Sequence, residues 1–236
     1  MYRAFSDVEG NLMKSLEETY NQSIRASQNI VEDIRFSRKL YLESVDSCSM
    51  QICNFKKHDT SILMLLNNVK SANPYLHSHP VNVAFLSLVI GVWLGLSDNK
   101  LLNLVKAGFL HDIGKAKIKD SLLNKSDQLT MEEVRTLKSH PVIGYKILKG
   151  TKKYDIEVLC GVLFHHERMD ETGYPVGLKG EYINLISRVI AIADTFDALT
   201  SDKAYRKKYS PLEALEEIKE NCTNLDLNIC DIFLKK

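Results

Sequence analysis

Seven side chains in this 236-residue sequence combine the residue type and the motif position expected of transition-metal ligands. Five of its seven histidines stand in or near short motifs, among them His-Asp, His-Pro and His-His-Glu, and two aspartates complete the set. Imidazole nitrogen together with carboxylate oxygen suits Mn, Fe, Co, Ni or Zn better than Ca or Mg alone. Seven donors are too many for one ion and about right for two. The candidate ligands of a dinuclear hydrolase centre are therefore His79, His111, Asp112, His140, His165, His166 and Asp194.

Almost every segment that must position these residues has the spacing of apolar residues expected of a helix. Thr130 and Glu133 form a capping box that starts a helix towards His140. Gly114 ends the helix before it, and residues 115–129 are expected to form a loop with short turns; glycine and proline mark a second loop at residues 170–182. Strand patterns are nearly absent, so the sequence predicts an all-α fold. We expect helices near residues 8–26, 36–56, 63–69, 80–96, 101–110, 142–148, 155–165, 185–199 and 211–221.

The charges of the chain are balanced, with 31 lysines and arginines against 30 aspartates and glutamates. This balance argues against DNA or an anionic membrane surface as a partner, so an anionic ligand must be held by a local cluster. The five cysteines form no C-x-x-C pair, and no secretory leader pattern is present, which favours reduced thiols in the cytoplasm. Residues 83–96 carry no charge, but a membrane span needs ~20 residues, so we expect a buried core helix and no membrane span.

Several motifs occur together in the order and spacing of a known family. His79, His111-Asp112 and Asp194 resemble the metal-binding pattern of the HD phosphohydrolase superfamily. Three further stretches are similar to the signature of its HD-GYP branch: 165–175 (HHERMDETGYP), 177–180 (GLKG) and 192–206 (IADTFDALTSDKAYR). The resemblance covers residues 58–221, most of the chain.

The resemblance implies an HD-domain helical bundle with an HD-GYP extension over residues 58–236. Residues 1–57 match no domain and are expected to form a helical lead that packs on the bundle or serves as a dimerisation arm. The implied activity is a cyclic di-GMP phosphodiesterase that releases pGpG, GMP or both. The seven candidate residues would bind two divalent ions, most often Fe or Mn in this family, with Asp112 as the bridging carboxylate.

The chemistry of a phosphodiester explains why the family needs such residues. The anion resists attack by water, and two ions roughly 3.5–4 Å apart can hold a water, lower its pKa and neutralise the phosphate. Lys115 would lie near the scissile phosphate and stabilise the developing charge or protonate the leaving oxygen. The residues expected to contact substrate are Tyr174, Asp197, Lys203 and Arg206, with Asp197 able instead to orient a ligand.

Three positions depart from the usual family pattern. Glu171 stands where glycine is common in the D-G-x-G-Y-P loop, which suggests a different loop and a changed grip on substrate. Tyr75 stands where trinuclear relatives have glutamate, which favours two metals. Lys203 replaces a frequent arginine and so offers a point charge in place of a two-pronged donor.

Two other functions compete with the first. The same centre could hydrolyse cyclic GMP-AMP or another nucleotide, since the G-Y-P loop does not separate the cyclic dinucleotides. Alternatively, the chain could be a non-catalytic module that binds a cyclic dinucleotide or a diguanylate cyclase. His58 and His77 match no motif position and are expected to be ordinary surface or packing residues.

Overall fold

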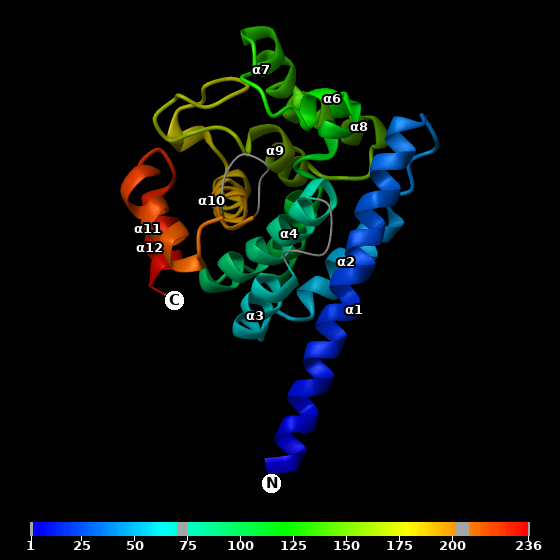
Figure 1. The fold of residues 1–236 in the computed structure, drawn as a ribbon, viewed down its shortest axis with the longest axis vertical. Coiled ribbons are helices and arrows are strands. Elements are labelled where there is room, and N and C mark those ends of the chain that lie inside the picture. The colour runs from blue at the N-terminus through cyan, green and yellow to red at the C-terminus, as the bar shows by residue number, and fades with distance from the viewer. Residues whose placement is uncertain (1, 70–74, 202–207, 236) are drawn as a thin grey trace.

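The computed structural model describes residues 2–69, 75–201 and 208–235. The described residues form helices and no strand, which confirms the all-α prediction; Asp170 and Lys179 make an isolated bridge. Figure 1 shows the arrangement. The elements are α1 (Tyr2–Arg35), α2 (Glu43–Cys53), α3 (Asp59–Val69), α4 (Tyr75–Trp93), α5 (Asp98–Leu110), η1 (Ile113–Lys117), α6 (Asp120–Leu123), α7 (Met131–Leu137), α8 (His140–Thr151), α9 (Ile156–Phe164), η2 (Gly180–Tyr182), α10 (Leu185–Thr200), α11 (Pro211–Asn221) and α12 (Leu227–Leu234).

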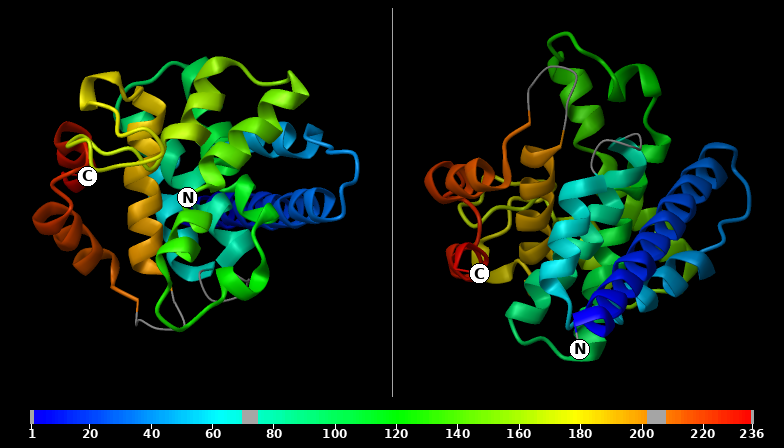
Figure 2. Two further views of the ribbon diagram at one scale, coloured as in Figure 1. Left: turned by 90° about the horizontal axis from the view of Figure 1, so that it is seen from above. Right: turned by 60° about the horizontal axis from the view of Figure 1, so that its bottom comes forward.

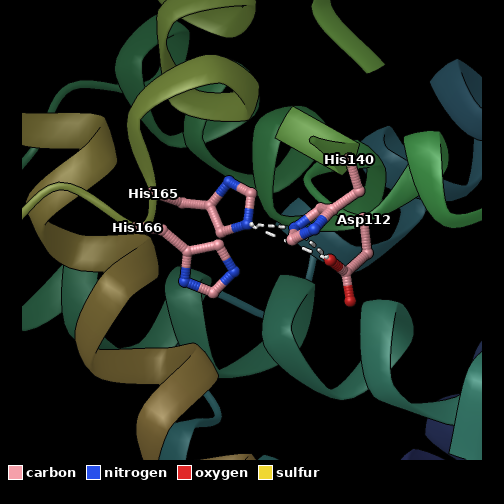
Figure 3. A group of neighbouring side chains, drawn as sticks. All are labelled: Asp112, His140, His165 and His166. Atoms are coloured by element: carbon pink, nitrogen blue, oxygen red, sulfur yellow. Dashed lines mark hydrogen bonds and ion pairs between the residues drawn. The ribbon is translucent and has the colours of Figure 1, made fainter. Parts of the chain in front are cut away.

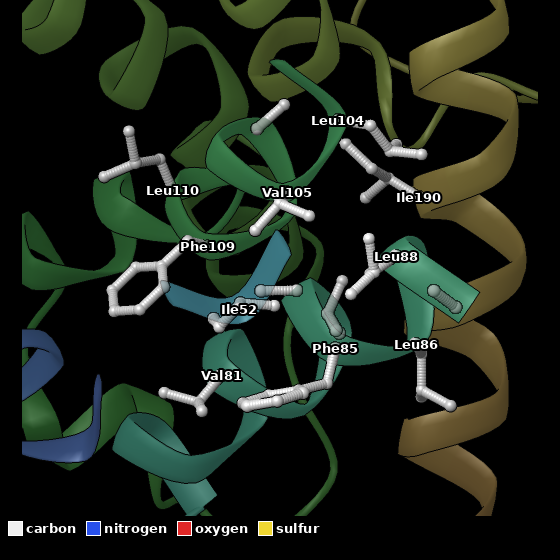
Figure 4. Close-up of a cluster of buried hydrophobic side chains, with 14 of the residues drawn as sticks. Ile52, Val81, Phe85, Leu86, Leu88, Leu104, Val105, Phe109, Leu110 and Ile190 are labelled. Atoms are coloured by element: carbon white, nitrogen blue, oxygen red, sulfur yellow. The ribbon is translucent and has the colours of Figure 1, made fainter. Parts of the chain in front are cut away.

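Helix α4 forms the centre of the hydrophobic core. Its apolar side chains are spread over all of its sides, and it packs against α5, α10, α1, α3, α2 and α12, which makes it a core element. Figure 4 shows side chains of α4 such as Phe85 and Leu88 interleaved with those of α5 and α10. In the described part of the chain, one helical window could span a membrane by length and composition, Leu76–Trp93; 78% of it is buried inside the protein.

Helix α1 is one continuous helix of 34 residues, longer than the predicted 8–26. It runs along the side of the bundle beside α4 (Figures 1 and 2), and its N-terminal part extends beyond the other helices (Figure 1). Leu16, Tyr20 and Ile24 of this helix are buried in the same hydrophobic cluster as α4. Packing is therefore continuous across residue 57, where the sequence suggests a domain boundary.

Two helix starts differ from the prediction. The helix predicted over 36–56 begins at Glu43, since Ser37 adopts a left-handed φ of 52° that ends α1. Helix α4 begins at Tyr75, so Pro80 lies inside its second turn, where proline costs one backbone hydrogen bond. The short turns expected within the loop at 115–129 are present as η1 and α6, whereas α12 was not predicted. The capping box of Thr130 and Glu133 is confirmed, with both of its hydrogen bonds present.

Five of the seven candidate ligands lie at or just after helix ends, whereas His79 and Asp194 lie within α4 and α10. His111 and Asp112 follow the last turn of α5, His140 starts α8, and His165 follows α9. Close contact between η1 and α8 requires glycine, because a Cβ at Gly114 would lie 2.0 Å from the carbonyl oxygen of His140. The missing side chain thus lets the segment after Asp112 approach the start of α8.

Candidate metal centre

All seven candidate metal-binding residues lie together, in two adjacent groups. One group is Asp112, His140, His165 and His166, drawn in Figure 3, and the other is His79, His111 and Asp194. Within each group, the potential ligand atoms lie within 4.8 Å of one another. Helices α4, α8 and α10 and the turns after α5 and α9 supply these residues, so only the folded bundle assembles the centre.

Asp112 lies between the two groups and directs one oxygen to each. Its Oδ1 lies 3.1 Å from His140 Nε2 and 3.9 Å from His165 Nε2. Its Oδ2 lies 3.5 Å from His79 Nε2 and 3.4 Å from His111 Nε2. A carboxylate in this position can bind two neighbouring cations at once.

The proton positions of the buried histidines follow from their partners. A carbonyl or carboxylate oxygen only accepts hydrogen bonds, so a ring nitrogen beside one carries the proton. Helix ends leave backbone carbonyls without partners inside the helix, and histidines use them here. Three rings donate from Nδ1 to a backbone carbonyl oxygen three residues earlier: His111 to Gly108 at 2.7 Å, His140 to Leu137 at 2.7 Å and His165 to Val162 at 2.8 Å. Nδ1 of His79 donates instead to the carboxylate of Asp197 at 2.7 Å.

This arrangement fits divalent cations. Nε2 of His140 and Nε2 of His165 face each other at 3.3 Å, although each ring already uses its Nδ1 proton elsewhere. Two lone pairs so close repel unless a cation lies near both. The Oδ1 atom of Asp112 is buried and accepts no hydrogen bond, which is costly for a carboxylate oxygen unless a cation satisfies it.

The protonation states of residues in both groups also favour divalent cations. Burial alone would raise the pKa of Asp194, but its hydrogen bond to His79 and the charge of that ring lower the pKa well below the usual range. Burial also lowers the pKa of His166 to about 3 and holds the pKa of His165 well below its usual value. Ionised carboxylates and neutral imidazoles are the forms that bind metal near neutral pH.

The pKa of His79 is raised, unlike those of His165 and His166, and this predicts that the metal affinity of the centre depends on pH. Burial alone would lower its pKa, but Asp194 and Asp197 outweigh burial and raise the pKa to about 9. A cation at Nε2 must displace the proton held there below that pH, so metal affinity should rise with pH and level off near 9. We expect roughly tenfold tighter Mn²⁺ binding per pH unit between 6.5 and 8.5, with about one proton released. Calorimetry in buffers of different ionisation enthalpy measures both quantities; pH-independent affinity would contradict the assignment of His79.

Lys115 places a positive charge beside the bridging carboxylate. Its Nζ donates to Oδ2 of Asp112 at 2.5 Å, and a quarter of its side chain, 25%, is exposed. Burial alone would lower its pKa, but the carboxylates of Asp112 and Asp194 raise the pKa above its usual value. Lys115 is therefore an ammonium that can donate to an anionic ligand.

A cavity of about 590 Å³ opens over the metal centre. At one end it is lined by His79, Asp112, Lys115, His140 and His166. The other end is formed mainly by the segment of α6 and α7, with the apolar side chains Leu76, Leu123, Leu129, Val134 and Leu137 beside the polar Asp120, Asn124 and Lys138. The volume is in the range of small-molecule sites, and its two ends suit a ligand that has both charged and flat apolar parts.

Comparisons with known proteins identify the family. A model of the HD domain family matches residues 64–229. The chain belongs to the HD domain family. It is 35% identical over 179 residues to cyclic di-GMP phosphodiesterase PA4108 of Pseudomonas aeruginosa, an alignment that covers 76% of this chain and 43% of that protein. It is 34% identical over 169 residues to 3'3'-cGAMP-specific phosphodiesterase 3 of Vibrio cholerae, covering 71% of this chain and 36% of that protein.

Among solved structures, the fold matches that of Bd1817, an HDG"Y"P protein from Bdellovibrio bacteriovorus. The TM-score is 0.74 at 18% sequence identity, and the match covers 100% of this chain and 80% of that chain. The predicted HD-domain bundle is thus confirmed. The chain spans less than half the length of the two curated relatives.

The G-Y-P segment of this HD domain is held against the centre by Glu167, a residue that the sequence analysis did not single out. Its carboxylate is buried and accepts hydrogen bonds from the backbone N–H groups of Val176, Gly177 and Leu178 at 2.8–3.2 Å. The signal was present as the third letter of the His-His-Glu motif. Tyr174 of this segment stacks on His166, with ring centroids 4.6 Å apart, and lines the cavity.

Of the residues predicted to contact substrate, Asp197 is described by the structure, whereas two others are not. Asp197 is fully buried and hydrogen-bonded to His79, so it is not placed to touch a ligand in the cavity, which corrects that prediction. It can orient a metal ligand, the other role expected of it. Lys203 and Arg206 lie outside the described residues.

Glu171 adopts a left-handed backbone conformation. Its φ is +66°, which costs a non-glycine residue roughly 1–2 kcal/mol of backbone strain. Glycine, which is common at this position in the family pattern, would adopt this φ without that cost.

We expect Glu171→Gly to relieve this strain and raise turnover. Glycine's flexibility in the unfolded chain offsets part of the gain, so the stability increase should be about 1 kcal/mol or less. Glu171→Ala removes the same exposed charge but keeps the strain, and serves as the matched control. Equal effects of the two substitutions on the unfolding midpoint and kcat would assign the effect to charge and not to backbone conformation.

Proposed function

We propose that the chain is a metal-dependent phosphodiesterase that hydrolyses a cyclic dinucleotide, with cyclic di-GMP as the preferred substrate and pGpG, GMP or both as products. One observation carries the proposal. Asp112 joins two groups of histidine and carboxylate donors directly below a cavity that also holds Lys115. The similarity to PA4108, whose name states this activity, supports it.

The residues present would hold two divalent transition ions, Fe or Mn, one in each group, with Asp112 shared. Such ions lower the pKa of water and neutralise phosphate charge. Seven neutral or anionic donors suit Fe and Mn alike, so the proposal does not choose between them.

The remaining residues have separate tasks in this proposal. Lys115 donates to a phosphate oxygen and stabilises the charge that develops on the leaving oxygen. Tyr174 presents a ring to a base, and the apolar wall formed by Leu129, Val134 and Leu137 excludes water from its other side. Lys203 and Arg206 are proposed to hold the second phosphate or a guanine edge.

A second substrate, 3'3'-cGAMP, follows from the similarity to the Vibrio cholerae enzyme. Because the two dinucleotides differ in one base only, the metal centre treats them alike and discrimination falls to the cavity wall. All five cysteines are free thiols, and we place the enzyme in the cytoplasm on that basis. A homodimer through residues 1–57 and a diguanylate cyclase contact belong to the proposal as its macromolecular partners.

The decisive experiment is an anaerobic assay with Mn²⁺ or Fe²⁺ that follows cyclic di-GMP and 3'3'-cGAMP by chromatography. Faster cleavage of cyclic di-GMP supports the proposal, and faster cleavage of 3'3'-cGAMP supports the second substrate. Cleavage of neither by protein that carries two metals per chain would point to a different phosphoester. Cleavage of neither by protein without metal would favour a binding module.

A further inference from the structure

A chain of buried hydrogen bonds leads from the N-terminal helix to the metal centre. The hydroxyl of Tyr20 on α1 donates to Oδ1 of Asn82 on α4 at 2.9 Å. Nδ2 of Asn82 donates to Oδ1 of Asp197 at 2.9 Å, and Oδ2 of Asp197 accepts from Nδ1 of His79 at 2.7 Å. The exposed fractions of the four side chains are 1%, 1%, 0% and 2%, so water does not compete for these bonds.

In this series of hydrogen bonds, each side chain determines the orientation of the next one. A side-chain amide can be rotated so that either its oxygen or its NH₂ group faces a partner. Burial and the nearby Asp197 charge raise the pKa of Tyr20, so its hydroxyl keeps its proton and donates to the amide oxygen of Asn82. The NH₂ group of Asn82 therefore faces Asp197. With one oxygen of Asp197 held by Asn82, the other is positioned for His79.

Tyr20 comes from outside the part of the chain that matches the HD domain family. The family match covers residues 64–229, whereas Tyr20 lies on α1. Its ring packs against Phe85 of α4, with centroids 6.1 Å apart, and α1 lies along α4 (Figures 1 and 2). The N-terminal helix therefore contributes a polar group to a network that ends at the centre.

We propose that Tyr20 is a positioning residue for the metal centre: through Asn82 and Asp197 it sets the orientation of His79, and the docking of α1 thereby sets the metal affinity of the site. A carboxylate that accepts from the far nitrogen of a metal-binding histidine orients the ring and increases its basicity. Hydrogen bonds in a buried chain strengthen one another, so loss of the first weakens the last. The inference rests on the proposed function only in requiring that the centre bind divalent cations.

The test uses Tyr20→Phe in the full chain, because phenylalanine keeps the ring that packs on Phe85 and removes only the hydroxyl. Co²⁺ is titrated into metal-free protein, with calorimetry for affinity and visible absorption for ligand geometry. We expect Asp197→Asn to weaken Co²⁺ binding roughly 10–100-fold, as for other direct partners of metal ligands. Tyr20 is connected to Asp197 only through Asn82, so Tyr20→Phe should weaken Co²⁺ binding less, roughly threefold to tenfold, and should change the visible absorption band of bound Co²⁺.

Ile24→Val is the matched control. Ile24 lies one turn further along α1 and is also buried, so the substitution loosens helix packing and lowers Tm without touching the hydrogen-bond chain. If Tyr20→Phe alters Co²⁺ affinity and absorption no more than Ile24→Val does, the inference is wrong. Wild-type protein that binds no Co²⁺ overturns both the inference and the proposed function. Wild-type protein that binds Co²⁺ but cleaves no cyclic dinucleotide overturns only the proposed function, and the same titration still decides the role of Tyr20.

Discussion

Replacing His111 and Asp112 together with alanine is expected to abolish hydrolysis and to remove bound metal. Asp112 has one oxygen within 4 Å of histidines in each group, so its loss removes a donor from both sites at once. The loss of His111 removes a second donor from one of them. Metal content, measured by mass spectrometry of purified protein, should fall from about two ions per chain to near zero.

The control for this variant is His58→Ala, which removes an exposed histidine outside the centre. It should retain both the metal and the activity of the wild type. Circular dichroism should show that the double variant keeps its helices, since the hydrophobic core around α4 is untouched. If the double variant retains its metal, the two groups of residues are not the metal site.

Replacing Lys115 with methionine is expected to separate catalysis from metal binding. Methionine keeps the length and apolar character of the stem but removes the ammonium that faces the cavity. Removing one preorganised donor to developing charge commonly costs 10²–10³-fold in kcat, and we expect a loss of about that size. Metal affinity should stay the same or increase, because a cation that repels the ions is gone and Asp112 loses a competing partner.

Lys119→Met provides the comparison, since Lys119 is an exposed lysine four residues along the chain. Its kcat and metal content should equal those of the wild type. Single-turnover kinetics with saturating Mn²⁺ would show whether the chemical step itself is slowed. A Lys115→Met enzyme with normal single-turnover rate would exclude a role for this residue at the phosphate.

The sequence alone indicated the seven candidate metal-binding residues, because their types and motif positions are local features. Adjacent histidine and aspartate at the end of an apolar helix, as in His111-Asp112, indicate metal binding when further histidines recur at helix ends. Local hydrogen bonding likewise determined the start of α7, because the capping box of Thr130 and Glu133 joins residues only three apart. For the same reason the all-α class was predictable from the spacing of apolar side chains.

Only the tertiary structure decided how these residues divide into two groups and what supports them. The bonds from Tyr20 to Asn82, Asn82 to Asp197 and His79 to Asp197 join residues 62, 115 and 118 positions apart, distances at which no local pattern exists. Asp197 was expected to face substrate because it lies one turn from Asp194, but packing of α10 against α4 buries it beside His79. The spacing of apolar residues in the sequence shows which face of a helix will be buried. Which other helix contacts that face depends on how the whole chain packs.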